Sequence, residues 1–343
     1  MILALKLLHG YSNIWPAEQM SHETLHTYLQ REVGDPDLRD LIDRIASACW
    51  SISTLVAESA IDGNLGQSGT INSQGEDQKP LDILANEVFV RSCVGNSRVA
   101  TIVSEEVEDV IKVSQPSEGD FLIAFDPLDG SSNLDVDLSV GSIFAIAKVK
   151  EAKADCVLQR GRKLLCSGYA LYGPSTVFVV TLGDRVDGFS LDQETDTFVL
   201  THPRMTVPRE TTEFAINVSR LRHWDAEIQN YIAECIEGPS GPRGKAFNMR
   251  WTASMVAEVH RILVRGGVFL YPVDAENSAQ GGKLRLLYEA NPIAMIMEAA
   301  GGLATDGRRP LLDKVPSHHH ERTSVVLGSR AEVERVAQAY LQT

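Results

Sequence analysis

Residues 121–133 read FLIAFDPLDGSSN, so that a wholly apolar run leads into two carboxylates and then into a glycine with small polar neighbours. The apolar run predicts a buried strand, and we expect Pro127 to end it because proline has no N–H group for a ladder. Asp126 and Asp129 would then lie at the end of this strand. The Gly-Ser-Ser that follows, residues 130–132, offers N–H groups and hydroxyls that suit a phosphate. Carboxylates for a hard cation beside donors for a phosphate indicate metal-assisted phosphoryl chemistry.

An ordinary turn is the simpler interpretation of these residues, because Asp-Pro and Asp-Gly are common turn dipeptides. The rest of the chain argues against it. Another strand-like run, residues 99–103, ends in Ser104-Glu105-Glu106, and adjacent carboxylates repel each other unless a cation neutralises them. Further acidic residues near the ends of predicted elements are Glu76, Asp82 and Glu289. So many carboxylates at such positions favour a shared metal site.

Hydrophobic spacing predicts a mixture of helices and strands, and therefore an α/β fold. The predicted helices cover residues 37–59, 82–94, 224–236, 252–264, 291–300 and 331–341. The predicted strands cover residues 99–103, 121–125, 140–149, 176–182, 198–201, 213–217 and 268–271. Asn291 and Pro292 are expected to be the N-cap and first-turn residues of their helix.

Composition narrows the possible partners. The chain has 343 residues and a formal net charge of −14, which argues against a nucleic-acid partner because no basic face is available to follow phosphates. The apolar segment at residues 2–8 is too short to span a membrane, so no membrane partner is expected. Five cysteines without metal spacing predict a reducing, cytoplasmic location, and a regulatory disulfide between Cys156 and Cys166 is not expected.

Four blocks of the sequence, taken in chain order, resemble class I fructose-1,6-bisphosphatase. The blocks are residues 104–106, 126–133, 266–272 and 282–289. The second block alone would indicate only the wider superfamily that includes the inositol monophosphatases, whereas the last block is typical of the sugar bisphosphatases. The resemblance runs from about Ser21 to the C-terminus and so covers nearly the whole chain.

The resemblance implies a layered α-β-α-β-α sandwich. It divides the chain into an N-terminal domain, residues 21–205, with most metal ligands, and a C-terminal domain, residues 206–343, with most sugar-phosphate contacts. Residues 1–20 would be either a short N-terminal arm or sequence upstream of a misassigned start, and we expect catalysis not to need them. The glycine-rich stretch 62–70 matches a loop that closes over the metals in the family, and a plain surface connector is the alternative.

Carboxylate side chains are the ligands that Mg²⁺ prefers. By side-chain type the metal ligands would be Glu105, Glu106, Asp126, Asp129 and Glu289. By resemblance, the main-chain carbonyl of Leu128 is a further ligand, and two or more Mg²⁺ ions bind per site, with Mn²⁺ able to substitute. Glu106 and Asp82 are candidates for activating the attacking water, with Glu76 supporting the lid or a third metal. Helix N-capping is the alternative role for Asp82.

The reacting phosphate is expected to lie on Asp129, Gly130, Ser131 and Ser132. For the second phosphate, the residues that match the family's motif positions are Asn217, Arg250, Tyr271 and Lys283. By resemblance, Arg250 reaches into a neighbouring subunit's site, within a homotetramer. Trp251 and Arg220 stand where many relatives have tyrosine, and both departures concern the region of the second phosphate.

The resemblance therefore implies Mg²⁺-dependent hydrolysis of the 1-phosphate of D-fructose 1,6-bisphosphate, in a pathway of either gluconeogenesis or carbon fixation. Sedoheptulose 1,7-bisphosphate, alone or as a second substrate, is the alternative. Inositol monophosphatase activity and a catalytically silent sugar-phosphate sensor are less favoured. Animal relatives bind inhibitory AMP where this chain has the acidic stretch 35–39 and Asp120, so we expect weak or absent AMP inhibition. The histidines at 318–320 are not expected to share a metal ion, because consecutive side chains point in different directions.

Overall fold

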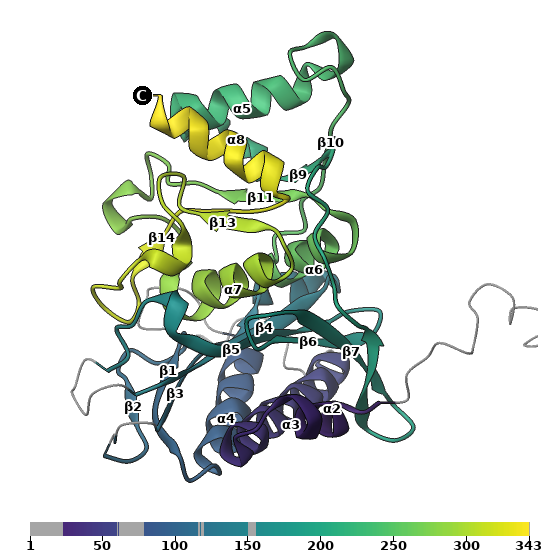
Figure 1. The fold of residues 1–343 in the computed structure, drawn as a ribbon, viewed down its shortest axis with the longest axis vertical. Helices are drawn as coiled ribbons and strands as arrows, with labels where there is room; N and C mark the ends of the chain where they lie inside the picture. Colours follow the sequence, from purple (N-terminus) through teal and green to yellow (C-terminus); the bar gives the residue numbers. More distant parts are fainter. Residues whose placement is uncertain are drawn as a thin grey trace, which may run out of the picture.

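The computed structural model of the protein describes residues 23–59, 61, 79–115, 117, 120–149 and 156–342, and the following description concerns these residues alone. They form five stacked layers of helices and sheets (Figure 1). This α-β-α-β-α arrangement confirms the fold expected from the sequence. The N-terminal arm at residues 1–20, the expected lid at 62–70 and Glu76 lie outside the described residues.

The first helical layer lies below the large sheet in Figure 1. The longest helix begins at Pro36, where the Asp35 side chain accepts hydrogen bonds from the backbone N–H groups of Asp37 and Leu38 at 3.0 and 3.4 Å. Its apolar stripe packs against the neighbouring helices and one face of the sheet. The helices of this layer are α2 (Leu25–Glu32), α3 (Pro36–Glu58) and α4 (Pro80–Val94).

The large sheet has eight strands in the order β2-β1-β3-β4-β5-β6-β7-β8. Strands β1 and β3 are parallel, and the other neighbours are antiparallel. Helices cover both faces, which explains why strands such as β4 are apolar almost throughout. The strands are β1 (Val99–Ser104), β2 (Ile111–Lys112), β3 (Phe121–Asp129), β4 (Val140–Lys148), β5 (Leu164–Tyr172), β6 (Thr176–Thr181), β7 (Val186–Asp192) and β8 (Thr197–His202).

Strand β3 corrects the prediction that Pro127 ends the strand. The strand continues to Asp129, and its register with β4 shifts between Asp126 and Asp129. Pairing with β1 stops at Phe125, so the missing N–H group of Pro127 deprives no neighbour of a hydrogen bond. The Pro127 carbonyl accepts a hydrogen bond from the Ser142 hydroxyl of β4 at 2.7 Å. The two carboxylates are thus placed on an irregular strand end.

The second half of the chain forms the three remaining layers. A five-stranded sheet has the order β10-β9-β11-β15-β13, and β12 pairs with β14 separately. Helices α6 and α7 lie between the two sheets, and α5 and α8 cover the outer face (Figure 1). The strands are β9 (Glu213–Ala215), β10 (Asn248–Met249), β11 (Val268–Tyr271), β12 (Leu284–Arg285), β13 (Leu303–Thr305), β14 (Arg322–Thr323) and β15 (Val325–Gly328). The helices are α5 (Ala226–Ile236), α6 (Met255–Arg265), α7 (Asn291–Ala299) and α8 (Arg330–Leu341).

Short helical turns connect these elements, and three of them reach the site described below. They are the 3₁₀ turns η3 (Ser131–Val136) and η5 (Val218–His223) and the π-helical turn η8 (Leu286–Ala290). Turn η8 runs directly into α7, so Ala290 rather than Asn291 is the N-cap position, and the prediction for Asn291 was wrong. The early start of the helical backbone has a local cause. The Glu289 carboxylate accepts a hydrogen bond from the backbone N–H of Arg285, so helical backbone begins one turn before Asn291.

Candidate active site

A cavity of about 440 Å³ lies where the ends of β1 and β3 meet elements of the second half of the chain. It brings together thirteen residues that the sequence proposed for the site. They are Asp82, Glu105, Glu106, Asp126, Leu128, Asp129, Gly130, Ser131, Ser132, Asn217, Tyr271, Lys283 and Glu289. Segments more than 200 residues apart in the chain therefore converge on one cavity.

Arg250 is the one described candidate that does not line this cavity. Its guanidinium lies 3.5 Å from the Glu213 carboxylate, and its side chain is 44% exposed. The expectation that Arg250 acts in a neighbouring subunit's site therefore stays a prediction.

Three buried carboxylates form the centre of the cavity. Asp126, Asp129 and Glu289 each offer an oxygen atom, and these atoms lie within 4.8 Å of one another. Burial, followed by repulsion from Glu105, raises the pKa of Glu289 to about 8 and raises the pKa of Asp126 well above its usual range. Carboxylates held this close without solvent need a compensating cation, and their oxygen atoms fit Mg²⁺ by ligand type.

The N-terminus of α6 orients the Asp129 carboxylate. Its Oδ2 accepts hydrogen bonds from the Ser254 hydroxyl and from the backbone N–H of Val256, both at 2.9 Å. These bonds oppose the effect of burial, which is the largest influence and raises the pKa of Asp129 to about 6. Sequence analysis missed Ser254, although a serine before the apolar run that begins at Met255 is a recognisable N-cap signal.

Asp82 lines the cavity and also stabilises the start of α4. It lies at the third position of α4, and its Oδ2 accepts a hydrogen bond from the N–H of Lys79 at 2.8 Å. Lys79 is therefore the N-cap residue, and Asp82 stabilises the helix start from inside the first turn. Its buried Oδ1 makes no hydrogen bond of normal geometry with the described residues, although Ser131 is near enough to lower the pKa. Burial outweighs that effect and raises the pKa of Asp82 to about 6.

Arg285 is a buried cation among these carboxylates. Its side chain is 4% exposed, and Nη1 lies 2.8 Å from Glu105 Oε1 and 3.9 Å from Glu289 Oε2. Its backbone N–H donates to Glu289 Oε2 at 2.5 Å. The sequence did not single out Arg285, and no local signal distinguishes it, because its burial depends on the convergence of distant segments.

Gly130 is required by a close approach of two backbones. It has φ of 76°, in the left-handed region, and a Cβ atom built there would lie 2.8 Å from the Cβ of Ser254. A larger residue would therefore displace the N-terminus of α6 from Asp129. Ser131 and Ser132 follow in η3 and line the same cavity.

The second sheet contributes the remaining polar groups of the cavity: Asn217, Tyr271 and Lys283. Of the two departures from the family pattern, Trp251 lines the cavity and stacks on Phe269, with ring centroids 6.1 Å apart and an interplanar angle of 2°. Arg220 does not line it. Its guanidinium pairs with Asp274 at 2.9 Å and Glu276 at 2.6 Å, so its charge is neutralised by these two carboxylates.

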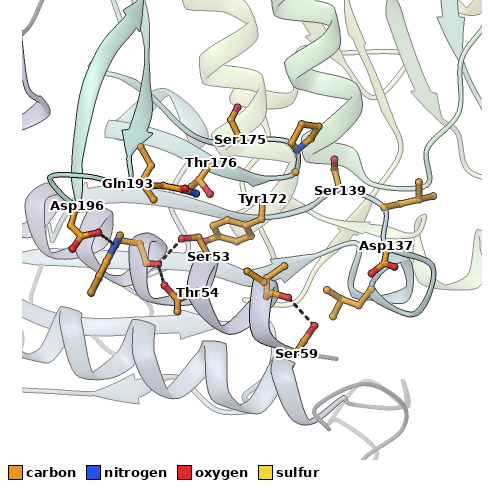
Figure 2. A pocket seen from close by; sticks show the side chains of 18 residues that line it. Ser53, Thr54, Ser59, Asp137, Ser139, Tyr172, Ser175, Thr176, Gln193 and Asp196 are labelled. Atoms are coloured by element: carbon orange, nitrogen blue, oxygen red, sulfur yellow. Dashed lines mark hydrogen bonds between the residues drawn. The ribbon is translucent and has the colours of Figure 1, made fainter. Parts of the chain in front are cut away.

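A larger hollow, of about 740 Å³, lies beside the C-terminal half of α3 and is shown in Figure 2. Hydroxyl and amide groups such as those of Ser53, Tyr172 and Gln193 surround it. The only charged residues among its described lining are Asp137 and Asp196. Without a lysine or arginine in that lining, this hollow is a poor site for a doubly phosphorylated sugar.

The five cysteines of the chain all lie among the described residues, and each is buried and unpaired. Burial raises the pKa of the Cys49 and Cys93 thiols to about 12, as expected for unreactive core residues. Among the described helices, none combines the length and the apolar character that crossing a membrane requires.

Comparison with known proteins places most of the chain in one family. Residues 20–203 match the family model "Fructose-1-6-bisphosphatase, N-terminal domain", and residues 207–341 match "Fructose-1-6-bisphosphatase, C-terminal domain". A protein of Methylobacillus flagellatus named "Fructose-1,6-bisphosphatase class 1" is 50% identical over 309 residues, which are 90% of this chain and 93% of the relative.

Solved structures of Leishmania major fructose-1,6-bisphosphatase have the same fold. The holo form superposes with a TM-score of 0.87 at 34% sequence identity and covers 94% of this chain and 100% of the other. The apo form gives a TM-score of 0.82 at 30% identity with the same coverage. The chain therefore belongs to the fructose-1,6-bisphosphatase family.

Proposed function

We propose that this protein hydrolyses the 1-phosphate of D-fructose 1,6-bisphosphate to give fructose 6-phosphate and inorganic phosphate, with two or more Mg²⁺ ions at the carboxylate cluster. Mn²⁺ can take the place of Mg²⁺. One observation carries the proposal: a single cavity holds the buried cluster of Asp126, Asp129 and Glu289 together with a lysine, a tyrosine and an asparagine from the second sheet. A substrate with two anionic groups fits both sets of residues.

The chain's own residues would divide the work as follows. Glu105, Glu106, Asp126, Asp129, Glu289 and the carbonyl of Leu128 would bind the metal, which when bound neutralises the phosphoryl charge and lowers the pKa of a coordinated water. Gly130, Ser131 and Ser132 would hold the reacting phosphate. Asp82, with one oxygen already engaged by Lys79 and a pKa raised to about 6, would accept a proton near neutral pH, together with Glu106.

Lys283, Tyr271 and Asn217 would bind the second phosphate, with Arg250 of a neighbouring subunit in a homotetramer. The exposed position of Arg250 outside its own chain's cavity supports this arrangement. The division of labour between residues 21–205 and 206–343 is part of the proposal. A cytoplasmic location is supported by the five unpaired cysteines. Glu76 is kept as a supporting catalytic residue on the strength of the family resemblance.

A substrate panel tests this function. We expect phosphate release from fructose 1,6-bisphosphate with the highest kcat/KM, loss of release in EDTA, and recovery with Mg²⁺ or Mn²⁺. The panel includes sedoheptulose 1,7-bisphosphate, fructose 6-phosphate and inositol 1-phosphate, with a coupled assay that detects fructose 6-phosphate as product. Turnover that survives EDTA, or equal turnover of inositol 1-phosphate, would refute the proposal. A higher kcat/KM for sedoheptulose 1,7-bisphosphate would make that sugar the preferred substrate in place of fructose 1,6-bisphosphate.

AMP is expected to inhibit the enzyme weakly or not at all. By resemblance, the stretch 35–39 and Asp120 stand where animal relatives bind AMP, and the Asp37 and Asp120 carboxylates both pair with Arg98 at 3.3 Å. This ion-pair cluster offers a phosphate no unpaired cation of its own and adds like-charge repulsion. In steady-state assays, AMP at about 1 mM should change the rate less than about twofold. Adenosine, which lacks the phosphate, is the control and should have the same small effect. Strong inhibition by AMP but not by adenosine would contradict the prediction.

A further inference from the structure

The loop at residues 105–110, between β1 and β2, carries Glu105 and Glu106 without regular secondary structure. The first two N–H groups of this loop are held by hydrogen bonds to β3 and to the end of β1. Glu105 N donates to the Phe125 carbonyl at 3.2 Å, and Glu106 N donates to the Ser104 hydroxyl at 3.2 Å. The next two carbonyls, those of Val107 and Glu108, accept their hydrogen bonds from a distant part of the chain.

These hydrogen bonds come from the run of three histidines. His319 Nε2 lies 2.7 Å from the Glu108 carbonyl, and His320 Nε2 lies 3.2 and 3.1 Å from the carbonyls of Val107 and Glu108. A carbonyl oxygen can only accept, so Nε2 of each ring carries the proton. Burial lowers the pKa of His320 to about 4, which agrees with a neutral ring.

The other nitrogen of His320 contacts η8, the turn that carries Glu289. Because Nε2 carries the proton, Nδ1 of the neutral ring accepts the hydrogen bond from the Tyr288 hydroxyl at 2.7 Å. Tyr288 is fully buried in η8, directly before Glu289. His320 therefore bridges two segments that each carry proposed metal ligands.

We propose that His320 is a positioning residue for the carboxylate cluster: it sets the distance between the Glu105–Glu106 loop and Glu289, with Tyr288 orienting its ring and His319 as a second donor. This geometry leaves no nitrogen of His320 for a metal, because Nε2 and Nδ1 are both hydrogen-bonded to protein groups. The catalytic part of the inference rests on the proposed function. The metal-binding part does not.

The test measures Mn²⁺ affinity by electron paramagnetic resonance, without substrate, alongside kcat, KM and thermal unfolding of the full chain. His320→Phe keeps an aromatic ring but removes the hydrogen bonds of both ring nitrogens. We expect this variant to raise the Kd for Mn²⁺ about tenfold and to lower kcat about tenfold, which is the low end for residues that orient metal ligands. The KM for the sugar bisphosphate should change less than about twofold. His320→Gln keeps a donor for the loop carbonyls and should recover most of both losses.

Two further variants complete the design. Tyr288→Phe removes only the hydroxyl that orients the ring, so its effect on Mn²⁺ affinity should lie between those of His320→Phe and the wild type. The matched control is His318→Ala, in the exposed first histidine of the run, which should behave as the wild type.

The inference is overturned if His320→Phe binds Mn²⁺ as tightly as the wild type, or if His318→Ala causes an equal loss. Should His320→Phe fail to fold, wild-type Mn²⁺ affinity in Tyr288→Phe overturns it and a measurable loss supports it. A wild-type protein that binds Mn²⁺ without releasing phosphate would refute the proposed function, while the Mn²⁺ comparison would still decide the role of His320.

Discussion

Replacing Asp129 with asparagine is expected to lower kcat for fructose 1,6-bisphosphate by about 10³-fold, the upper range for loss of one preorganised charged group, with the fold retained. The carboxylate is one of the three buried acids whose oxygen atoms lie within 4.8 Å of one another. The asparagine oxygen can still accept the hydrogen bonds of Ser254 and Val256. The substitution also removes one of several mutually repelling charges, so the metal-free protein should unfold at the same temperature or a higher one.

The matched control is Asp137→Asn. Asp137 lies eight residues further along, is exposed and has φ of 54°, a left-handed conformation that asparagine also adopts readily. The control makes the same aspartate-to-asparagine substitution outside the catalytic cavity, and we expect its kcat to stay within about twofold of the wild type. Steady-state kinetics with saturating Mg²⁺ and thermal unfolding in EDTA measure both variants. Near-wild-type kcat in Asp129→Asn would exclude this carboxylate from the reaction. A lower kcat accompanied by unfolding of the variant would mean that Asp129 has a structural role only.

The convergence of acidic side chains could be predicted because each one follows or precedes an apolar run. The carboxyl ends of parallel strands lie at the same edge of a sheet, so carboxylates after residues 99–103 and 121–125 had to lie near each other if the two runs became neighbouring parallel strands. They did, as the parallel pair β1 and β3. The family resemblance then added Glu289 and Lys283, whose positions relative to that edge depend on the second half of the chain.

Features that depend on tertiary contacts were not predictable in the same way. Nothing in the local sequence distinguishes Arg285, which is buried, from Arg322, its partner in the β12–β14 pair. The role of the histidine run was also hidden, because it depends on a contact across more than 200 residues with the carbonyls of Val107 and Glu108. Backbone acceptors of this kind leave no trace in side-chain patterns.

The errors in element boundaries have a common cause. Pro127 and Asn291 were interpreted by the usual preference of each residue type, as a strand breaker and a helix cap. In both places a site residue alters the local backbone. The strand bulges between Asp126 and Asp129, and the π-helical turn carries Glu289. Local rules fail most often where the backbone is shaped to position functional groups.

Replacing Arg285 with methionine is expected to destabilise the metal-free protein by about 3–5 kcal/mol, the usual cost of breaking a buried ion pair by removing one partner. Glu105 would lose its cation at 2.8 Å, and Glu289 would lose the charge that lowers its pKa. Glu289 already has a pKa raised to about 8, and loss of Arg285 raises it further. Up to about pH 8 the folded wild type and the folded variant both keep this proton, and above that pH only the variant does, so the extra destabilisation should grow as the pH rises from about 7 toward 9.

Urea unfolding in EDTA at both pH values measures this effect, and Arg322→Met is the matched control on the facing strand. Arg322 donates to the Gln280 side chain at 2.6 Å, so its loss should cost less than about 1 kcal/mol. Added Mg²⁺ should recover part of the stability of Arg285→Met, because a cation bound by the folded state alone replaces some of the missing positive charge. If Arg285→Met were as stable as the wild type at pH 8 in EDTA, the carboxylates would not need a buried cation, and the electrostatic basis for metal binding at this cluster would be lost.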